Sequence, residues 1–144
     1  MQSIIFTKEQ VNKTLPLVKN ITNDIMKTWN IIIESRAKCE KLEIQMKKYK
    51  SLDDKSASDL AEYKDGLNVY IDRINRYIKE IEALGAFVEE FRRGIVNFPT
   101  IVYDRKAFIC IRPLEEDEAT YFHELDETFA DRQELPSAEH RLTD

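Results

Sequence analysis

The chain has 144 residues, of which 34% are charged and 42% are hydrophobic, and its net charge at pH 7 is -5. This composition is typical of a soluble, helix-rich protein, and the length predicts one domain over residues 1–144. The charge is uneven, because residues 111–144 contain eleven acidic and three basic side chains. An acidic end argues against general nucleic-acid binding and is compatible with a cation or a basic partner.

The cysteines indicate an intracellular protein with reduced thiols. Cys39 and Cys110 lie far apart, and neither belongs to a Cys-x-x-Cys motif. The start of the chain lacks the basic and apolar regions of a signal peptide. No apolar run is long enough to span a bilayer. We therefore expect a cytoplasmic protein that does not enter the membrane.

The first helix is predicted over residues 8–50. Thr7 and Gln10 have the spacing of a capping box, and Phe6 and Val11 have the spacing of a hydrophobic staple. Apolar residues at helical spacing follow as far as Ile33 and then become sparser. A helix of this length would extend over roughly 65 Å.

The second helix is predicted over residues 56–85. Its apolar residues alternate in steps of three and four, a narrow stripe typical of a coiled coil: Leu60, Tyr63, Leu67, Tyr70, Ile74, Tyr77, Ile81 and Leu84. Ser56 or Ser58 is the predicted N-cap, and Gly85 suits a left-handed C-cap. The short connection predicts an antiparallel helical hairpin.

Two long helices by themselves do not bury both of their apolar stripes. We expect a homodimer, in which two hairpins form a four-helix bundle. The alternative is a monomer whose C-terminal segment covers the open face. The basic residues between 36 and 50 are interpreted as a solvated helix face, because no aromatic residues alternate with them as in a nucleic-acid site.

After Gly85 the pattern changes toward the period of two that is typical of strands. β-Branched and aromatic residues predict strands at Ile95–Val96, Thr100–Tyr103 and Ala107–Ile111, with a hairpin loop at Asp104–Lys106. We therefore predict a mainly α (α+β) fold: a long antiparallel helical hairpin, then a small, acidic C-terminal cap over residues 86–132 that contains a β-hairpin. Residues 133–144 are predicted to be a loose tail.

Landmarks spread along the chain resemble a known family. They are Phe6–Thr7, Leu15–Pro16, Gly94–Pro99, the strand that ends in Cys110, and the aromatic-His-Glu stretch that leads to Phe129–Arg132. Together they resemble the prokaryotic family known as domain of unknown function 2203, over nearly the whole chain. The resemblance implies no activity, because none is established for the family.

The chain also departs from the family pattern. Family members have a glycine-rich Gly-Phe-Ala-Gly-Arg where this chain has Thr128–Arg132, and tryptophans where it has Phe122 and Ile111. Glycines allow a ligand to approach the backbone closely, so their absence argues against a shared ligand site.

The stretch after residue 120 contains the candidate metal ligands. A neutral His123 together with Glu124, Asp126 or Glu127 can bind a divalent metal, and Cys110 is a softer candidate ligand. On a strand, His123 would share a face with Leu125 and Glu127. On a helix it would instead share a face with Asp126 and Glu127. The competing interpretation is a histidine that only hydrogen-bonds a carboxylate.

Nucleophilic catalysis is not supported by the pattern. Cys110 lies in an apolar predicted strand, where burial would raise the pKa of its thiol and leave it inert. No catalytic residue is assigned, and whether the chain is an enzyme stays open, with a non-enzyme favoured. The leading hypothesis is a self-associating interaction module whose acidic cap docks a protein partner. The alternative is a metal-dependent enzyme or metal-binding sensor whose site centres on His123.

Overall fold

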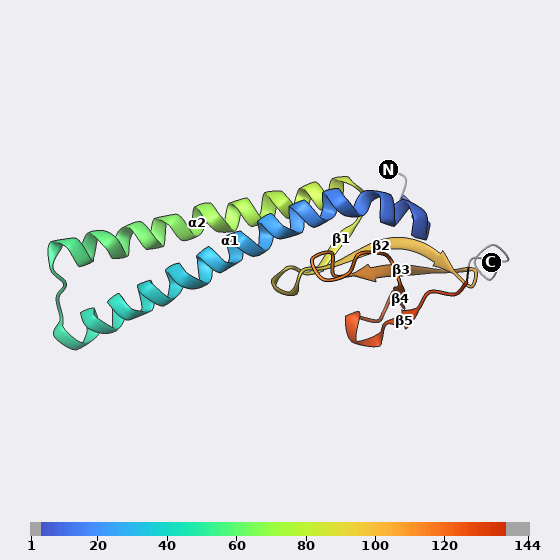
Figure 1. Cartoon of the computed structure of the whole chain (residues 1–144). Coiled ribbons are helices and arrows are strands. Elements are labelled where there is room, and N and C mark those ends of the chain that lie inside the picture. The colour runs from blue at the N-terminus through green and yellow to red at the C-terminus, as the bar shows by residue number, and fades with distance from the viewer. Residues whose placement is uncertain (1–3, 138–144) are drawn as a thin grey trace. The chain divides into compact units, whose positions relative to one another are not determined.

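The fold is known from a computed structural model, and residues 4–137 are described (Figure 1). Two helices are followed by five strands and two short 3-10 turns: α1 (Lys8–Tyr49), α2 (Asp54–Ala83), β1 (Phe87–Glu90), η1 (Phe91–Arg93), β2 (Ile95–Val102), β3 (Arg105–Ile111), β4 (Tyr121–Glu124), η2 (Phe129–Asp131) and β5 (Gln133–Glu134). The predicted α+β class, with a helical hairpin before a C-terminal part that contains a β-hairpin, is confirmed.

The chain forms two compact units. The sheet unit contains Met1–Ile25 and Tyr77–Asp144, and the helical unit contains Met26–Arg76. The prediction of one domain over residues 1–144 stays a prediction. In the part of the chain that the structure describes, no helix is long and apolar enough to cross a membrane.

Helix α1 begins as its sequence predicts. The backbone N–H of Thr7 donates to Gln10 Oε1 at 2.9 Å, and the N–H of Gln10 donates to Thr7 Oγ1 at 3.2 Å. These two bonds form the capping box, which satisfies backbone donors that have no partner inside the helix. Phe6 and Val11 are both buried, as expected for the staple.

Helix α2 begins two residues earlier than predicted, and its N-cap is neither Ser56 nor Ser58. The Asp53 carboxylate accepts the N–H of Ser56 at 2.7 Å, so Asp53 is the capping residue. The carboxylate is a better acceptor for a helix N-terminus than a serine hydroxyl, because it also carries the negative charge that the helix dipole favours. None of the eight residues of the α2 stripe is exposed.

Gly85 ends α2 as predicted, in a left-handed conformation with φ 97°. The N–H of Gly85 donates to Glu82 O at 2.9 Å, and the N–H of Ala86 donates to Ile81 O at 3.3 Å. This pair of bonds is a Schellman motif. A Cβ at Gly85 would come within 2.8 Å of Ile4 Cδ1, so the position favours glycine for space as well as for conformation.

The five strands form one antiparallel sheet in the order β1-β2-β3-β4-β5. The predicted hairpin is the β2-β3 pair, but its turn is shorter than predicted. Val102 pairs with Arg105, so the turn is Tyr103-Asp104, and both of these residues have positive φ. Arg105 and Lys106 belong to β3, because a two-residue turn with positive φ at both positions matches the twist of the flanking strands.

Strand β2 also runs through Pro99, which lies outside the strands predicted from the sequence. Pro99 O accepts the N–H of Phe6 at 2.7 Å, and β1 does not extend this far along β2. Proline is tolerated here because this side of β2 is an edge, where the missing N–H breaks no ladder bond.

One face of the sheet forms the core of the sheet unit. Phe98, Ile109 and Phe122 lie side by side on β2, β3 and β4, and each is at most 3% exposed. The Phe98 ring packs edge-on against Phe6, with 5.1 Å between the ring centroids. Each such buried side chain contributes about 1.5–3 kcal/mol.

The predicted loose tail differs from the structure at its first residues. Gln133–Glu134 forms β5, and Leu135 N donates to Thr120 O at 2.8 Å. Leu135 also packs against a buried cluster of Val102, Ala107 and Phe122. Residues 138–144 of the predicted tail lie outside the described residues.

Candidate metal centre

The sheet face opposite the core gathers four polar side chains, one from each of four strands. Asn97 on β2 pairs directly with Cys110 on β3, so their side chains leave the sheet on the same face. His123 on β4 pairs with Phe108, two residues before Cys110, and therefore shares that face. Glu89 of β1 completes the group.

Glu89 reaches this group because of an irregularity in β1. Val88 pairs with Val96 and Glu90 pairs with Ile95, so Glu89 is an extra residue at a bulge. A bulge bends its strand and changes the direction of a side chain. Its carboxylate contacts the side chain of Asn97 on the next strand and that of His123 on β4.

Three of these residues place ligand atoms around one point. A carboxylate oxygen of Glu89, the sulfur of Cys110 and a ring nitrogen of His123 all lie within 4.8 Å of one another. Cys110 is 0% exposed and His123 is 1% exposed. The Glu89 side chain is 18% exposed, so it is the most accessible of the three.

The hydrogen bonds of His123 determine which ring nitrogen faces the group. Nδ1 lies 2.8 Å from Glu124 O, and a carbonyl oxygen only accepts, so Nδ1 carries a proton. Nε2 lies 2.8 Å from Glu89 Oε1. A histidine whose Nδ1–H donates to a backbone carbonyl has the orientation commonly found when Nε2 binds a metal.

The Glu89 carboxylate is held in its charged form. Burial acts to raise its pKa, but hydrogen bonds from the Asn97 side chain, the Phe129 backbone and His123 together outweigh burial, and the pKa is lowered. The Asn97 and Phe129 bonds are 2.8 and 2.9 Å long. Glu89 therefore offers a negatively charged oxygen at neutral pH.

Asn97 brings a second oxygen to the same region. Its Nδ2 donates to Glu89 Oε1, while its Oδ1 is buried and has no hydrogen-bond partner among the described residues. A buried acceptor without a partner is uncommon in proteins and indicates a group that the structure does not contain, such as a water or an ion. Asn97 lies directly opposite Cys110, so this oxygen lies on the face that carries the three ligand atoms.

The Cys110 thiol is neutral when no metal is bound. Burial and the negative charge of Glu89 raise its pKa to about 12, and the Arg132 charge opposes them only partly. This agrees with the expectation from the sequence that Cys110 is inert as a free nucleophile. A bound divalent cation would replace the thiol proton, because metal coordination deprotonates a cysteine.

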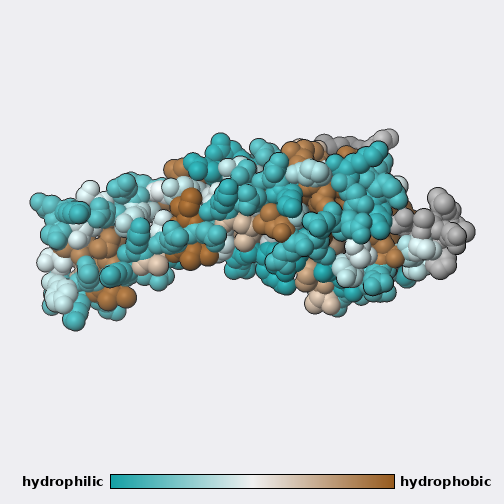
Figure 2. Space-filling model, in the orientation of Figure 1, coloured by the Kyte–Doolittle hydropathy of each residue, from teal (hydrophilic) through white to brown (hydrophobic). Residues whose placement is uncertain are grey.

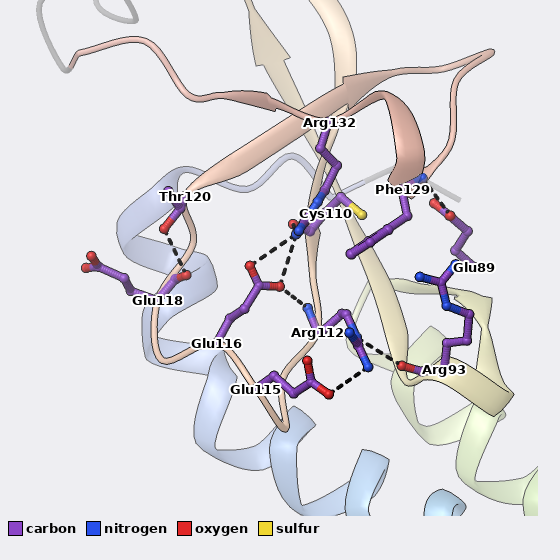
Figure 3. A network of polar contacts seen from close by, with 10 residues as sticks. All are labelled: Glu89, Arg93, Cys110, Arg112, Glu115, Glu116, Glu118, Thr120, Phe129 and Arg132. Carbon is purple, nitrogen blue, oxygen red and sulfur yellow. Dashed lines mark hydrogen bonds and ion pairs between the residues drawn. The ribbon is translucent and has the colours of Figure 1, made fainter.

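The segment after β4 lies against this group (Figure 3). Phe129 N donates to Glu89 Oε2, as the dashed line in Figure 3 shows. Arg132 donates to Cys110 O at 3.2 Å and to both Glu116 oxygens at 3.0 and 3.1 Å. Part of the predicted acidic docking surface is thus paired within the chain, and docking of a partner there stays a prediction.

The structure separates the candidate ligands that the sequence suggested. Residues 121–124 are a strand, so Glu124 lies on the face opposite His123, where it pairs with Arg105 at 2.6 Å. Glu127 accepts the N–H of Glu124 at 2.9 Å, and Asp126 is exposed. Cys110 and His123 are brought together, whereas Glu124, Asp126 and Glu127 do not belong to the group.

Glu89 and Asn97 are not among the candidate ligands predicted from the sequence. No strand was predicted before Ile95, and a bulge leaves no periodic signal. Asn97 is a polar residue within the apolar run Ile95–Phe98, which is a signal that was available in the sequence. A buried polar residue in a strand requires a partner, so this position is where the site could have been sought.

The chain belongs to the uncharacterized conserved protein family DUF2203, whose family model matches residues 4–135. The resemblance noted from the sequence landmarks is therefore confirmed. Comparison with curated proteins and with solved structures finds no match.

Proposed function

We propose that this protein binds a divalent transition-metal ion at Glu89, Cys110 and His123. The observation that carries the proposal is the convergence of three ligand atoms of different elements, all within 4.8 Å of one another, on one covered face of the sheet. Such a convergence offers two negative charges, from a carboxylate and a thiolate, which balance a divalent ion.

The donor set indicates the class of metal. Sulfur and imidazole nitrogen favour zinc and related transition metals over magnesium or calcium, which prefer oxygen ligands. Three protein ligands leave a fourth position of a tetrahedral site open to water or to another ligand. The Asn97 oxygen is buried and has no partner among the described residues, so we expect it to accept a hydrogen bond from such a water.

Metal content is the direct test. Untagged protein purified without chelators, then incubated with zinc and freed of excess metal, should retain close to one zinc per chain by elemental analysis. The variant Cys110→Ser changes one ligand atom with little change in volume and should lose most of the metal. His123→Gln should do the same, and circular dichroism checks that both variants are folded.

Glu127→Gln is the matched control, since Glu127 lies near His123 in sequence but outside the three ligands. It should retain the wild-type metal content. If the wild type binds no zinc, cobalt or iron, or if Cys110→Ser and Glu127→Gln behave alike, the proposal is wrong.

A second candidate function is self-association through the helical unit. Within residues 26–76, three apolar residues are buried, namely Ile32, Cys39 and Ile74. Seven large apolar residues of the same unit are exposed: Ile31, Ile33, Ile44, Met46, Tyr49, Val69 and Ile71. Figure 2 shows hydrophobic residues, in brown, at the surface of the helices. A helical pair that exposes more large apolar residues than it buries favours a second copy as the partner.

Light scattering after size-exclusion chromatography tests this second proposal. Ile33 and Ile44 lie about three turns apart on one side of α1. The double variant Ile33→Glu/Ile44→Glu should shift a dimer toward a monomer. Leu17→Glu, at a residue of the sheet unit that is 50% exposed, should leave the dimer intact. A wild-type protein that is monomeric at every concentration would exclude self-association.

A further inference from the structure

Three arginines surround the ring of Phe129. The guanidinium carbons of Arg132, Arg93 and Arg112 lie 3.9, 4.9 and 5.9 Å from the ring centroid. Arginines stack on aromatic rings in this way because the ring face is electron-rich. We call these three residues the arginine cluster, and Figure 3 draws it together with Glu89 and Cys110.

Two of the three charges in the arginine cluster are neutralised within the chain. Arg112 pairs with Glu115 at 2.7 Å, and Arg132 pairs with Glu116 at 3.0 Å. Arg93 is exposed, and its guanidinium has no carboxylate partner among the described residues. The nearby Glu90 instead pairs with Arg92 at 3.1 Å. One guanidinium with free donors therefore remains.

The arginine cluster adjoins the three proposed metal ligands. Phe129, at its centre, donates its backbone N–H to Glu89. Arg132 donates to the backbone oxygen of Cys110 at 3.2 Å. Cys110 thus contacts the arginine cluster through its backbone oxygen, and Glu89 contacts Phe129, the residue that the three arginines surround.

From this arrangement we infer that the metal site takes a small oxyanion, a carboxylate or phosphate group, which binds the metal at its open position and the free guanidinium of Arg93. The inference rests on the proposed metal-binding function. A guanidinium presents several N–H donors in a planar fork that matches the oxygens of a carboxylate or a phosphate.

The charges favour an anion over a neutral ligand. A divalent ion with one thiolate and one carboxylate has no net charge, and a neutral imidazole adds none. The guanidinium of Arg93, which has no carboxylate partner among the described residues, then adds a positive charge next to Phe129, whose backbone N–H donates to Glu89. An oxyanion balances this charge, and it supplies the oxygen donor that a transition metal accepts as a further ligand.

Cobalt-substituted protein tests the inference, because a cobalt–thiolate site absorbs visible light and its spectrum changes with the ligand set. The loaded protein is titrated with acetate and, separately, with inorganic phosphate, at constant pH and ionic strength. Wild-type protein should show a saturable spectral change with at least one of them. A spectral change with acetate alone would assign a carboxylate site, and a change with phosphate alone would assign a phosphate site. A change with both would assign a general oxyanion site.

The matched variants are Arg93→Gln and Arg92→Gln, at neighbouring residues of η1. Arg93→Gln should lower the affinity for the anion by at least about tenfold, which corresponds to about 1.4 kcal/mol of binding free energy. Arg92→Gln should retain wild-type affinity. Cobalt bands that neither anion alters, or an effect that persists fully in Arg93→Gln, would overturn the inference and leave metal binding intact. Absence of cobalt bands would overturn metal binding and the inference with it.

Discussion

The Nε2 atom of His123 lies 2.8 Å from Oε1 of Glu89, although the two residues are far apart in the chain and lie on strands at opposite sides of β2 and β3. The other ring nitrogen donates to a backbone carbonyl. A carboxylate oxygen and an unprotonated ring nitrogen both only accept, so this contact is a hydrogen bond only when one of the two atoms carries a proton. A metal ion would take the place of this proton, so the same contact is satisfied in both states.

The contribution of Glu89 to stability should depend on pH. Its pKa is lowered in the folded protein, because hydrogen bonds from Asn97, Phe129 and His123 outweigh the opposing effect of burial. Because the pKa is lowered in the folded protein, the stabilisation is present above the ordinary glutamate pKa of 4.5 and is lost as the pH falls through the pKa of the folded state.

We expect Glu89→Gln to lower the free energy of unfolding of the metal-free protein by about 2 kcal/mol at pH 7. The difference from wild type should shrink below pH 4.5. Urea unfolding at several pH values measures it, with the exposed α2 variant Glu62→Gln as the control. A difference that is independent of pH would show that the charge of Glu89 is not what stabilises the fold.

Asn97 should position Glu89. Asn97→Asp removes the N–H donor and places a second carboxylate beside the first, so the metal-free protein should unfold at a temperature several degrees lower. Added zinc should restore more of the lost stability than it does in wild type, because the new carboxylate favours a cation. Asn75→Asp, at an exposed position of α2, should change neither value. Equal effects of the two variants in thermal unfolding would argue against a positioning role.

Cys110 should resist thiol reagents in the folded, metal-free protein. Its pKa of about 12 means that, at pH 8, on the order of one thiol in ten thousand is ionised. In a Cys39→Ala background, labelling by a disulfide reagent should be slow until guanidinium unfolds the chain. Rapid labelling of one thiol per folded chain would contradict the burial of Cys110.

Replacing Gly66, within α2, and Gly85, just after the end of α2, by alanine should change the stability in opposite directions. Gly85→Ala forces a side chain into a left-handed conformation, at a cost of about 1–2 kcal/mol, and into the Ile4 side chain. Gly66→Ala, within α2, meets only an ordinary contact of 3.7 Å with Tyr70 and should stabilise the protein by about 1 kcal/mol. Chemical unfolding of both variants measures the two effects. A neutral Gly85→Ala would show that the C-cap is not strained.

Local chemistry made much of the helical part predictable. The Thr7 capping box, the Gly85 C-cap and the α2 stripe depend on residues within a few positions of one another, so their spacing is visible in the sequence. The predicted N-cap of α2 was wrong because several polar residues between 51 and 58 can cap the helix. The choice among them depends on the path of the loop.

The residues of the candidate site were likewise only partly predictable from the sequence. Cys110 and His123 were suggested by residue type, and the inert thiol followed from its apolar strand. Glu124, Asp126 and Glu127 were suggested by closeness in sequence, yet β4 directs Glu124 to the other face of the sheet. Glu89 reaches the site because of the bulge in β1, and β2 and β3 lie between β1 and the strand that carries His123. Neither the bulge nor the order of the strands is visible in the sequence.

The sequence by itself determined the helices, their hairpin connection and the strand-forming character of residues 95–111, because these follow from periodicity and from capping and turn residues. Only the tertiary structure decided which residues meet at the candidate metal centre. Antiparallel pairing in register brings Glu89, Cys110 and His123 together from three strands, and the distances between them depend on strand order, register and one bulge. These are properties of the assembled sheet, since no segment of the chain contains them alone.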